Sequence, residues 1–354
     1  MPVVDIHSHV IPPSVVEAIA TDPMGFSARI EEEDGMRKVV HDQGYAYPLF
    51  EEFVEPEAKL REMDRRGLDV SVLSPPPPLF YYWAEAEMGV QVARLVNDGI
   101  AEYVATSPEH FIGMATVPMQ DTEAAVAELE RVVSTYRFQA VEIGTSVEGT
   151  QLTDPRFRNF LRRASELDVL ILAHPYYVGA KQGLEDYYLT NLLGNPYDST
   201  VMIANLMFSG VLDELPAIKL CVAHGGGFAP YQIGRLQHGH RVRSEPKVNT
   251  ETPPLKLLGQ LFFDTITFCP RALRYLIDLV GAEHVVLGTD APFDMGDEDP
   301  LKTVGAIPGV TDEEREAILS KTASELLGNK TRVLSKRLNL FGDLRVSCKT
   351  PHGS

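Results

Sequence analysis

Short apolar segments recur along the chain and alternate with segments of helical periodicity. Runs such as VLILAHP and VVLGTD are almost continuously apolar, which is typical of parallel strands covered on both faces. The segments 56–67, 121–136 and 269–281 instead have the spacing of helices. Asp121 and either Thr153 or Asp154 are expected to begin helices, and Gly67 and Gly281 to end two of them. We predict eight strands, at residues 3–10, 69–75, 111–118, 140–146, 169–175, 219–225, 261–268 and 284–290.

Eight strands that alternate with helices predict an α/β fold, a (β/α)8 TIM barrel. The alternative is a doubly wound open sheet, which would want a glycine-rich turn after the first strand, whereas that turn reads HSHVIPP. Residues 12–55 predict a lid-like insertion over the barrel mouth, with a small hairpin at Asp34 and Gly35. Residues 329–354 are barely periodic. We therefore expect one barrel domain at residues 1–328 and a C-terminal tail.

Composition narrows the class of protein. The 354 residues include 50 Asp plus Glu against 32 Lys plus Arg, and a net charge of -18 argues against a nucleic-acid partner. No run of about 18 uncharged apolar residues is present, so no membrane partner is expected. Cys221, Cys269 and Cys348 form neither an even disulfide framework nor a CxxC pair. With an N-terminus unlike a signal peptide, these observations predict a cytoplasmic protein.

Polar side chains stand at the carboxyl ends of four predicted strands. They are His7 and His9 on the first strand, His174 on the fifth, His224 on the sixth and Asp290 on the eighth. In a (β/α)8 barrel these strand ends surround one mouth, where active sites lie. A single histidine at a strand end is usually a hydrogen-bonded core residue, but five such residues at one mouth make that interpretation improbable. Imidazole and carboxylate together are the ligands of Zn2+ or a similar divalent ion.

The motifs DxHxH, LAHP, HGGG and GTDxPF resemble the amidohydrolase superfamily in its amidohydrolase-related branch. The chain is most similar to the 2-amino-3-carboxymuconate 6-semialdehyde decarboxylase family, over residues 3–327. The resemblance implies that His7, His9, His174 and Asp290 bind one divalent metal, Zn2+ foremost and Mn2+ as the alternative. It also implies that His224 acts as the catalytic acid/base, with Asp290 able to relay a proton.

The same resemblance bears on the substrate. Arg235 matches a family arginine that binds a substrate carboxylate across a dimer interface, which implies a homodimer. Tyr47, before Pro48, stands where the family has a second arginine for substrate carboxylate. The lost guanidinium argues against the semialdehyde and favours a less charged molecule, such as a hydroxylated aromatic acid. Phe80 and the aromatic residues after it could line a ring-binding site, although packing against the lid explains them equally well.

The activity that the resemblance implies is non-oxidative decarboxylation of a small unsaturated or hydroxylated aromatic carboxylic acid. The substrate would be protonated at carbon before CO2 leaves. One alternative is a metal-dependent hydrolase or hydratase of a lactone, amide or unsaturated acid, and another is a barrel that binds metal without turnover. The end of the fourth strand, at Glu142, supplies no lysine for a second metal, which favours one metal without excluding hydrolysis. No organic cofactor is expected.

Overall fold

The eight apolar segments form eight parallel strands in one sheet. The computed structural model describes residues 1–176 and 182–328. The strands lie side by side in chain order, and every ladder that joins neighbours is parallel. They are β1 (Val4–His9), β5 (Val70–Ser74), β6 (Phe111–Ala115), β7 (Ala140–Gly144), β10 (Leu170–His174), β11 (Lys219–Val222), β12 (Phe262–Asp264) and β13 (Val285–Val286).

The sheet closes into a barrel where the chain after β13 returns to β1. The backbone N–H of Ile6 donates to the carbonyl of Leu287 at 3.0 Å, and that of His9 donates to Ala291 at 2.8 Å. Ser8 and Ala291 also form an isolated parallel bridge. The predicted (β/α)8 barrel is confirmed, and the open-sheet alternative is wrong. The backbone N–H groups of Thr289 and Asp290 also donate to the carbonyl of His7, at 3.2 and 2.8 Å, so irregularly spaced hydrogen bonds rather than a regular ladder join the first and last strands.

Branched apolar side chains fill the interior of the barrel, as the fold requires. Helix α15 (Thr322–Leu326) packs against this interior cluster, so it closes one end of the barrel. At the carboxyl ends of the strands the side chains are polar, as at His9 on β1 and His174 on β10. The interior cluster includes Val4, Ile6, Val70, Val72, Ile112, Met114, Ala140, Leu170, Leu172, Cys221, Ala223 and Val286.

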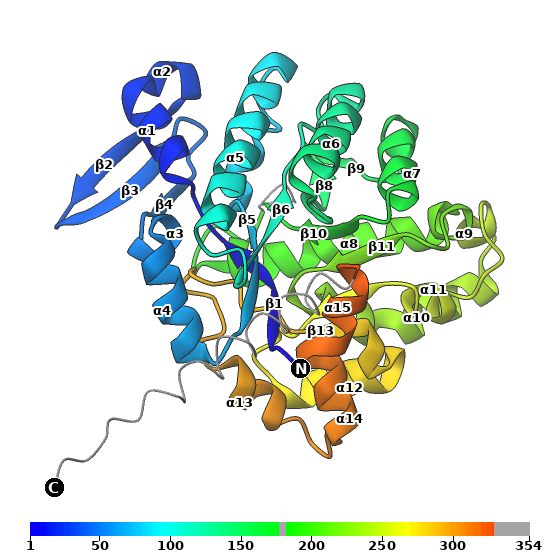
Figure 1. Cartoon of the computed structure of the whole chain (residues 1–354). Coiled ribbons are helices and arrows are strands. Elements are labelled where there is room, and N and C mark those ends of the chain that lie inside the picture. Colours follow the sequence, from blue (N-terminus) through cyan, green and yellow to red (C-terminus); the bar gives the residue numbers. More distant parts are fainter. Residues whose placement is uncertain (177–181, 329–354) are drawn as a thin grey trace, which may run out of the picture.

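Helices surround the strands (Figure 1). Among the helices that the structure describes, none is long and apolar enough to cross a membrane. The α-helices are α1 (Pro13–Thr21), α2 (Pro23–Phe26), α3 (Glu51–Val54), α4 (Pro56–Arg66), α5 (Ala86–Thr106), α6 (Thr122–Tyr136), α7 (Arg158–Glu166), α8 (Asn195–Phe208), α9 (Val211–Glu214), α10 (Ala229–Val242), α11 (Pro254–Leu258), α12 (Pro270–Val280), α13 (Pro300–Gly305), α14 (Asp312–Glu316) and α15. Short 3₁₀ or π turns are η1 (Pro77–Phe80), η2 (Pro155–Phe157), η3 (Thr190–Gly194), η4 (His224–Gly226), η5 (Glu245–Lys247), η6 (Ala282–His284) and η7 (Ala317–Lys321).

The helix boundaries follow the predicted caps. The side chain of Asp121 accepts from two backbone N–H groups at the start of α6, and Asp154 accepts from the N–H of Arg156 at η2. Gly67 ends α4 with a φ of 75°, in the left-handed region that glycine adopts without strain. Gly281 follows α12 with a φ of 90°. These local signals therefore fix where the helices begin and end.

The segment after β1 contains the predicted hairpin. Strands β2 (Ala28–Glu33) and β3 (Met36–His41) pair around Asp34 and Gly35, and β4 (Ala46–Pro48) adds a third antiparallel strand. Both turn residues have positive φ, as a two-residue hairpin turn requires. This small sheet lies to one side of the barrel, beside α1 and α2 (Figure 1). Its action as a lid stays a prediction, and the predicted tail lies outside the described residues.

All eight strands are shorter than predicted, and the seventh and eighth differ most from their predicted bounds. The seventh ends at Asp264 because the side chain of Asp264 accepts from the N–H of Ile266, which turns the backbone. The eighth pairs regularly only at Val285 and Val286. Beyond that point the chain bends along β1, so the apolar run continues without a regular ladder. Apolarity alone does not reveal such a bend.

Candidate metal centre

The polar strand ends meet at one point, as predicted. His7 and His9 lie on β1, His174 ends β10, and Asp290 follows β13. One possible ligand atom from each of these four residues lies within 4.8 Å of the others. All four side chains are buried, and the two β1 histidines are fully so.

Asp290 lies at the centre of the cluster. Its Oδ1 atom is 3.0 Å from Nε2 of His9, 3.4 Å from Nε2 of His7 and 3.9 Å from Nε2 of His174. Its Oδ2 atom instead lies 3.4 Å from Nε2 of His224. One oxygen of the carboxylate therefore faces three imidazoles, and the other faces the imidazole of His224.

Each of the three clustered histidine rings is oriented by a hydrogen bond at its Nδ1 atom. His7 donates to Oδ2 of Asp264 at 2.7 Å, and His9 donates to the carbonyl of Pro75 at 3.1 Å. His174 donates to the carbonyl of Pro175 at 2.6 Å. A hydrogen bond at Nδ1 leaves Nε2 free to act as a metal ligand, and metal-binding histidines are commonly held in this way.

The free sides of the rings fit a cation. Nε2 of His7 and Nε2 of His174 are buried and have no hydrogen-bond partner within residues 1–176 and 182–328, which is costly unless another group meets them. Burial lowers the pKa of His9 to about 4 and that of His174 well below its usual range, so both rings are neutral at pH 7. Neutral imidazoles and an ionised carboxylate form the donor set of a divalent metal ion.

Charged neighbours set the protonation of the other two groups. Burial alone would lower the pKa of His7, but the hydrogen bond to Asp264 and the nearby carboxylate of Asp290 outweigh it and raise the pKa well above its usual value. Burial would raise the pKa of Asp290, but hydrogen bonds from His224 and His9 and the nearby ring of His7 hold it well below its usual range. The carboxylate is therefore ionised, and a bound cation would compete with the proton on His7.

His224 lies beside the cluster and not within it. The backbone φ of His224 is 57° and that of Asp290 is 59°. Positive φ values are uncommon for residues other than glycine. Asp264 holds this turn because its carboxylate accepts from the backbone N–H groups of His224 and Gly225. The His224 ring lies 4.9 Å from that of His174, between ring centroids. Its predicted acid/base role is compatible with this position and stays a prediction.

Asp264 is a site residue that the sequence analysis missed. Its carboxylate is fully buried, and its pKa is lowered because hydrogen bonds from His7 outweigh the effect of burial. It orients a proposed ligand through His7 and the adjoining turn through His224 and Gly225. The available signal was its position in FFDT at the end of the seventh strand, equivalent to the positions of the other polar strand ends.

Glu142 also lies closer to the site than its sequence context suggested. It is fully buried on β7, and one carboxylate oxygen lies 4.0 Å from Nδ1 of His9. Neither oxygen has a hydrogen-bond partner among the described residues, and burial raises the pKa to about 8. Glu142 is therefore protonated at neutral pH when no cation lies near it.

Two of the predicted substrate-binding residues, Phe80 and Tyr47, lie in different parts of the fold. Phe80 lies in η1 and stacks on Tyr82 with ring centroids 5.3 Å apart, while Tyr176 meets its ring at 5.8 Å. Phe80 and Tyr82 follow β5 in the chain, and Tyr176 follows β10, so the cluster joins the segments after two strands. Tyr47 lies in the small sheet, where its hydroxyl is 3.2 Å from Nε2 of His41. The structure thus ties Tyr47 to His41 and not to the histidine cluster.

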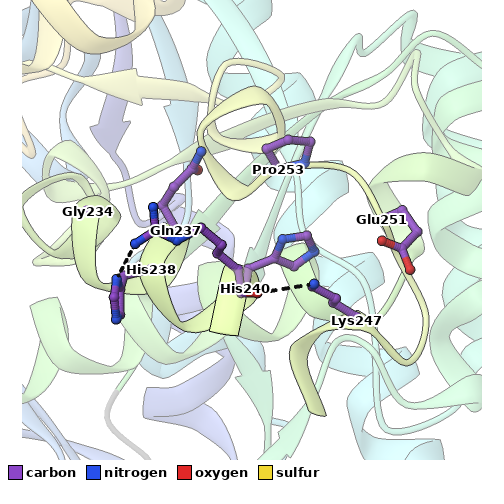
Figure 2. Close-up of a pocket in the computed structure, with 8 residues that line it drawn as sticks. Gly234, Gln237, His238, His240, Lys247, Glu251 and Pro253 are labelled. Carbon is purple, nitrogen blue, oxygen red and sulfur yellow. Dashed lines mark hydrogen bonds between the residues drawn. The ribbon is translucent and has the colours of Figure 1, made fainter. Parts of the chain in front are cut away.

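Arg235 lies on α10 with its side chain exposed. Among the described residues it makes no ion pair or hydrogen bond. A surface groove of about 560 Å³ lies along the same helix and includes Gly234 and His238 (Figure 2). Arg241 in this groove contacts Nδ1 of His238, and no residue of the histidine cluster lines it. The groove is therefore a feature of the outer surface, separate from the metal centre.

The chain matches known proteins over most of its length. The amidohydrolase family model matches residues 4–328. The 2-amino-3-carboxymuconate-6-semialdehyde decarboxylase of Dictyostelium discoideum is 30% identical over 92% of this chain and 91% of its own. The gamma-resorcylate decarboxylase of Rhizobium sp. (strain MTP-10005) is 28% identical over 67% of this chain and 77% of its own.

A solved structure has the same fold. It is the dihydroxybenzoic acid decarboxylase of Polaromonas sp. JS666 with bound manganese and the inhibitor 2-nitroresorcinol, 21% identical, with a TM-score of 0.73. The alignment covers 92% of this chain and 97% of that chain. The resemblance found in the motifs is therefore confirmed over the whole barrel. The chain belongs to the amidohydrolase family.

Proposed function

We propose that this chain is a metal-dependent, non-oxidative decarboxylase, a carboxy-lyase acting on a small hydroxylated aromatic or unsaturated carboxylic acid. The observation that carries this proposal is the convergence of three imidazoles and Asp290 at the barrel mouth, with His224 beside them. The two relatives named above are decarboxylases, in agreement with the sequence prediction. Their identities of 30% and 28% exceed the 24% of a 2-keto-4-carboxy-3-hexenedioate hydratase that matches 85% of the chain, which favours decarboxylation over hydration.

His7, His9, His174 and Asp290 would hold one divalent ion. Zn2+ is the foremost candidate because three imidazoles and one carboxylate suit it, and Mn2+ is the alternative because a structural neighbour contains it. When bound, such an ion polarises a substrate oxygen and stabilises negative charge there. Asp264 and the carbonyls of Pro75 and Pro175 keep the three rings oriented for this purpose.

His224 would donate the proton that decarboxylation needs, and Asp290 would stabilise the protonated imidazole. Decarboxylation of an aromatic acid needs one proton at the carbon that bears the carboxylate. The C–C bond then breaks, its electron pair restores the π system, and CO2 leaves. An imidazole is suited to give that proton near neutral pH. Oδ2 of Asp290, 3.4 Å from Nε2 of His224, can stabilise the protonated ring before the transfer.

The surroundings favour a planar, modestly charged substrate. Phe80, Tyr82 and Tyr176 form a buried aromatic cluster against which a ring could pack. Tyr47 offers a hydroxyl where the family has an arginine, and that hydroxyl contacts His41. A substrate with several carboxylates would therefore lack one of its guanidinium partners. This supports a hydroxylated benzoate-like acid over the semialdehyde.

The direct test is CO2 release across a panel of acids. Purified, metal-loaded protein is incubated with hydroxylated benzoates and with unsaturated dicarboxylic acids, and CO2 and the decarboxylated product are quantified together. We expect stoichiometric CO2 and product from at least one hydroxylated aromatic acid. Consumption of lactones or hydration of alkenes without CO2 would contradict the proposal.

We also propose a homodimer in which Arg235 serves the neighbouring subunit. Helix α10 begins close after His224, and Arg235 lies two turns along it, about 9 Å from the helix start. Its guanidinium is exposed and unpaired, and Tyr231 nearby is 78% exposed. Tyr231 and Tyr275 lie with ring centroids 6.5 Å apart, so apolar surface continues beside the arginine. Such a surface suits a subunit contact.

Subunit mixing tests this arrangement. Arg235→Ala is expected to raise KM for the carboxylic acid at least about tenfold with metal content unchanged, because a bidentate carboxylate contact is lost. Mixing Arg235→Ala chains with His224→Ala chains should restore activity, since one hybrid site carries both residues. If mixed dimers form and remain inactive, Arg235 does not act across the interface.

A cytoplasmic location is part of the same proposal. Cys221 is buried, Cys269 is exposed, and both are free thiols. Unpaired cysteines are typical of a reducing compartment. Cys348 lies outside the described residues.

A further inference from the structure

Lys59 is a buried lysine that the proposed chemistry does not use. It lies on α4, outside the ring of strands, yet its side chain is only 1% exposed. Full burial of an ammonium group is rare because desolvation of the charge is costly unless its donors are matched. Its contacts therefore indicate what this lysine does.

All three donors of the ammonium group have acceptors. Nζ lies 3.4 Å from the carbonyl of His9, 3.4 Å from the carbonyl of Ala291 and 3.2 Å from Oε1 of Glu52. His9 belongs to the metal cluster, and Ala291 follows Asp290, which also belongs to it. One ammonium group thus joins the backbone beside two proposed ligands that come from opposite ends of the chain.

These two carbonyls lie on either side of the barrel seam. The seam has no regular ladder at this point: the N–H of His9 donates to the carbonyl of Ala291, and the N–H groups of Thr289 and Asp290 both donate to the carbonyl of His7. The separation of His9 and Asp290, 3.0 Å between Nε2 and Oδ1, depends on how the two strand ends lie against each other. A shift at the seam would therefore change the spacing of metal ligands directly.

Charge compensation of Glu52 does not account for Lys59. Arg66 already binds Glu52 through two nitrogens, at 2.6 and 3.1 Å. Glu52 would keep this bidentate partner in the absence of Lys59. Within the described part of the chain, the ion pairs and hydrogen bonds of Arg66 are with Glu52, Glu62 and Glu298 and none reaches the seam, so the two cations of this buried network have separable roles.

We propose that Lys59 is a positioning residue for the metal centre: by bridging the carbonyls of His9 and Ala291 it fixes the barrel seam and so sets the affinity of the site for its divalent ion. The inference rests on the metal site of the proposed function and not on which acid is decarboxylated. Supporting residues of metal ligands typically change affinity by about 10–100-fold. We therefore expect a loss of this size when the bridge is removed.

The test compares Lys59→Met with Arg66→Met. Both remove one cation from the same buried network, and both should lower resistance to urea. The dissociation constants of Mn2+ and Zn2+ are measured by competition with a chromophoric chelator, without substrate. Lys59→Met should weaken binding about 10–100-fold, whereas Arg66→Met should leave it within about threefold of the parent. The EPR spectrum of bound Mn2+ should change in the first variant alone.

The sign of the effect separates positioning from simple electrostatics. Removal of a nearby positive charge should, by Coulomb's law, tighten the binding of a cation. Unchanged or tighter binding in Lys59→Met would overturn the proposal, as would equal weakening in both variants. If Lys59→Met fails to fold, Lys59→Gln, which keeps amide donors, is measured instead and must still weaken binding. Failure of the decarboxylase assignment would appear in the CO2 assay and leave these constants unaffected.

Discussion

Replacing His224 by alanine is expected to lower kcat by about 10²–10⁴-fold while the metal content stays at one ion per chain. This is the usual contribution of a positioned acid or base. His224 lies outside the four-residue cluster and faces the second oxygen of Asp290 at 3.4 Å. Its loss therefore removes a proton donor and leaves the proposed ligands in place. Elemental analysis and steady-state kinetics on the same preparation provide the measurement.

The metal content decides how this experiment is interpreted. If His224→Ala loses the ion, His224 is a ligand and its assigned role is wrong. A matched control is His238→Ala, which removes an exposed histidine of α10 outside the cluster. This control should keep both kcat and metal.

Replacing His174 by alanine is expected to lower metal occupancy and activity together. It removes one of four proposed protein ligands, so the affinity should fall by at least the roughly 10–100-fold seen when a supporting residue is lost. The ring is buried, and its Nε2 has no hydrogen-bond partner in the part of the chain that the structure describes. Dialysis against a weak chelator, followed by elemental analysis, should leave this variant depleted under conditions that leave the parent at one ion per chain.

A second buried histidine provides the control for packing. His240 is buried and its Nε2 contacts the carbonyl of Thr250, but it lies on α10 away from the cluster. His240→Ala should lower stability without loss of metal. Full metal retention in His174→Ala would exclude this residue as a ligand, and two ions per chain in the parent would exclude a mononuclear site.

The sequence determined the strands, their order and most of the polar residues that cluster at the barrel mouth. Continuous apolar runs specify strands buried on both faces, and parallel strands in a barrel bring their carboxyl ends together. His7, His9, His174, His224 and Asp290 could therefore be grouped without knowledge of any distance, and the family resemblance set His224 apart from the four proposed ligands. The turn at Asp34 and Gly35 and the caps at Asp121 and Gly67 depend only on local backbone chemistry, which explains their correct prediction.

Tertiary structure alone decided which polar residues support that cluster. Asp264 meets His7 across 257 positions of the chain, and Lys59 reaches Ala291 across 232. Neither contact has a local signature, because one depends on barrel closure and the other on the docking of α4. Tyr47, by contrast, contacts His41, which is close in sequence and lies in the same small sheet. Local periodicity records which face of an element is buried, whereas the partner on that face is set by long-range packing.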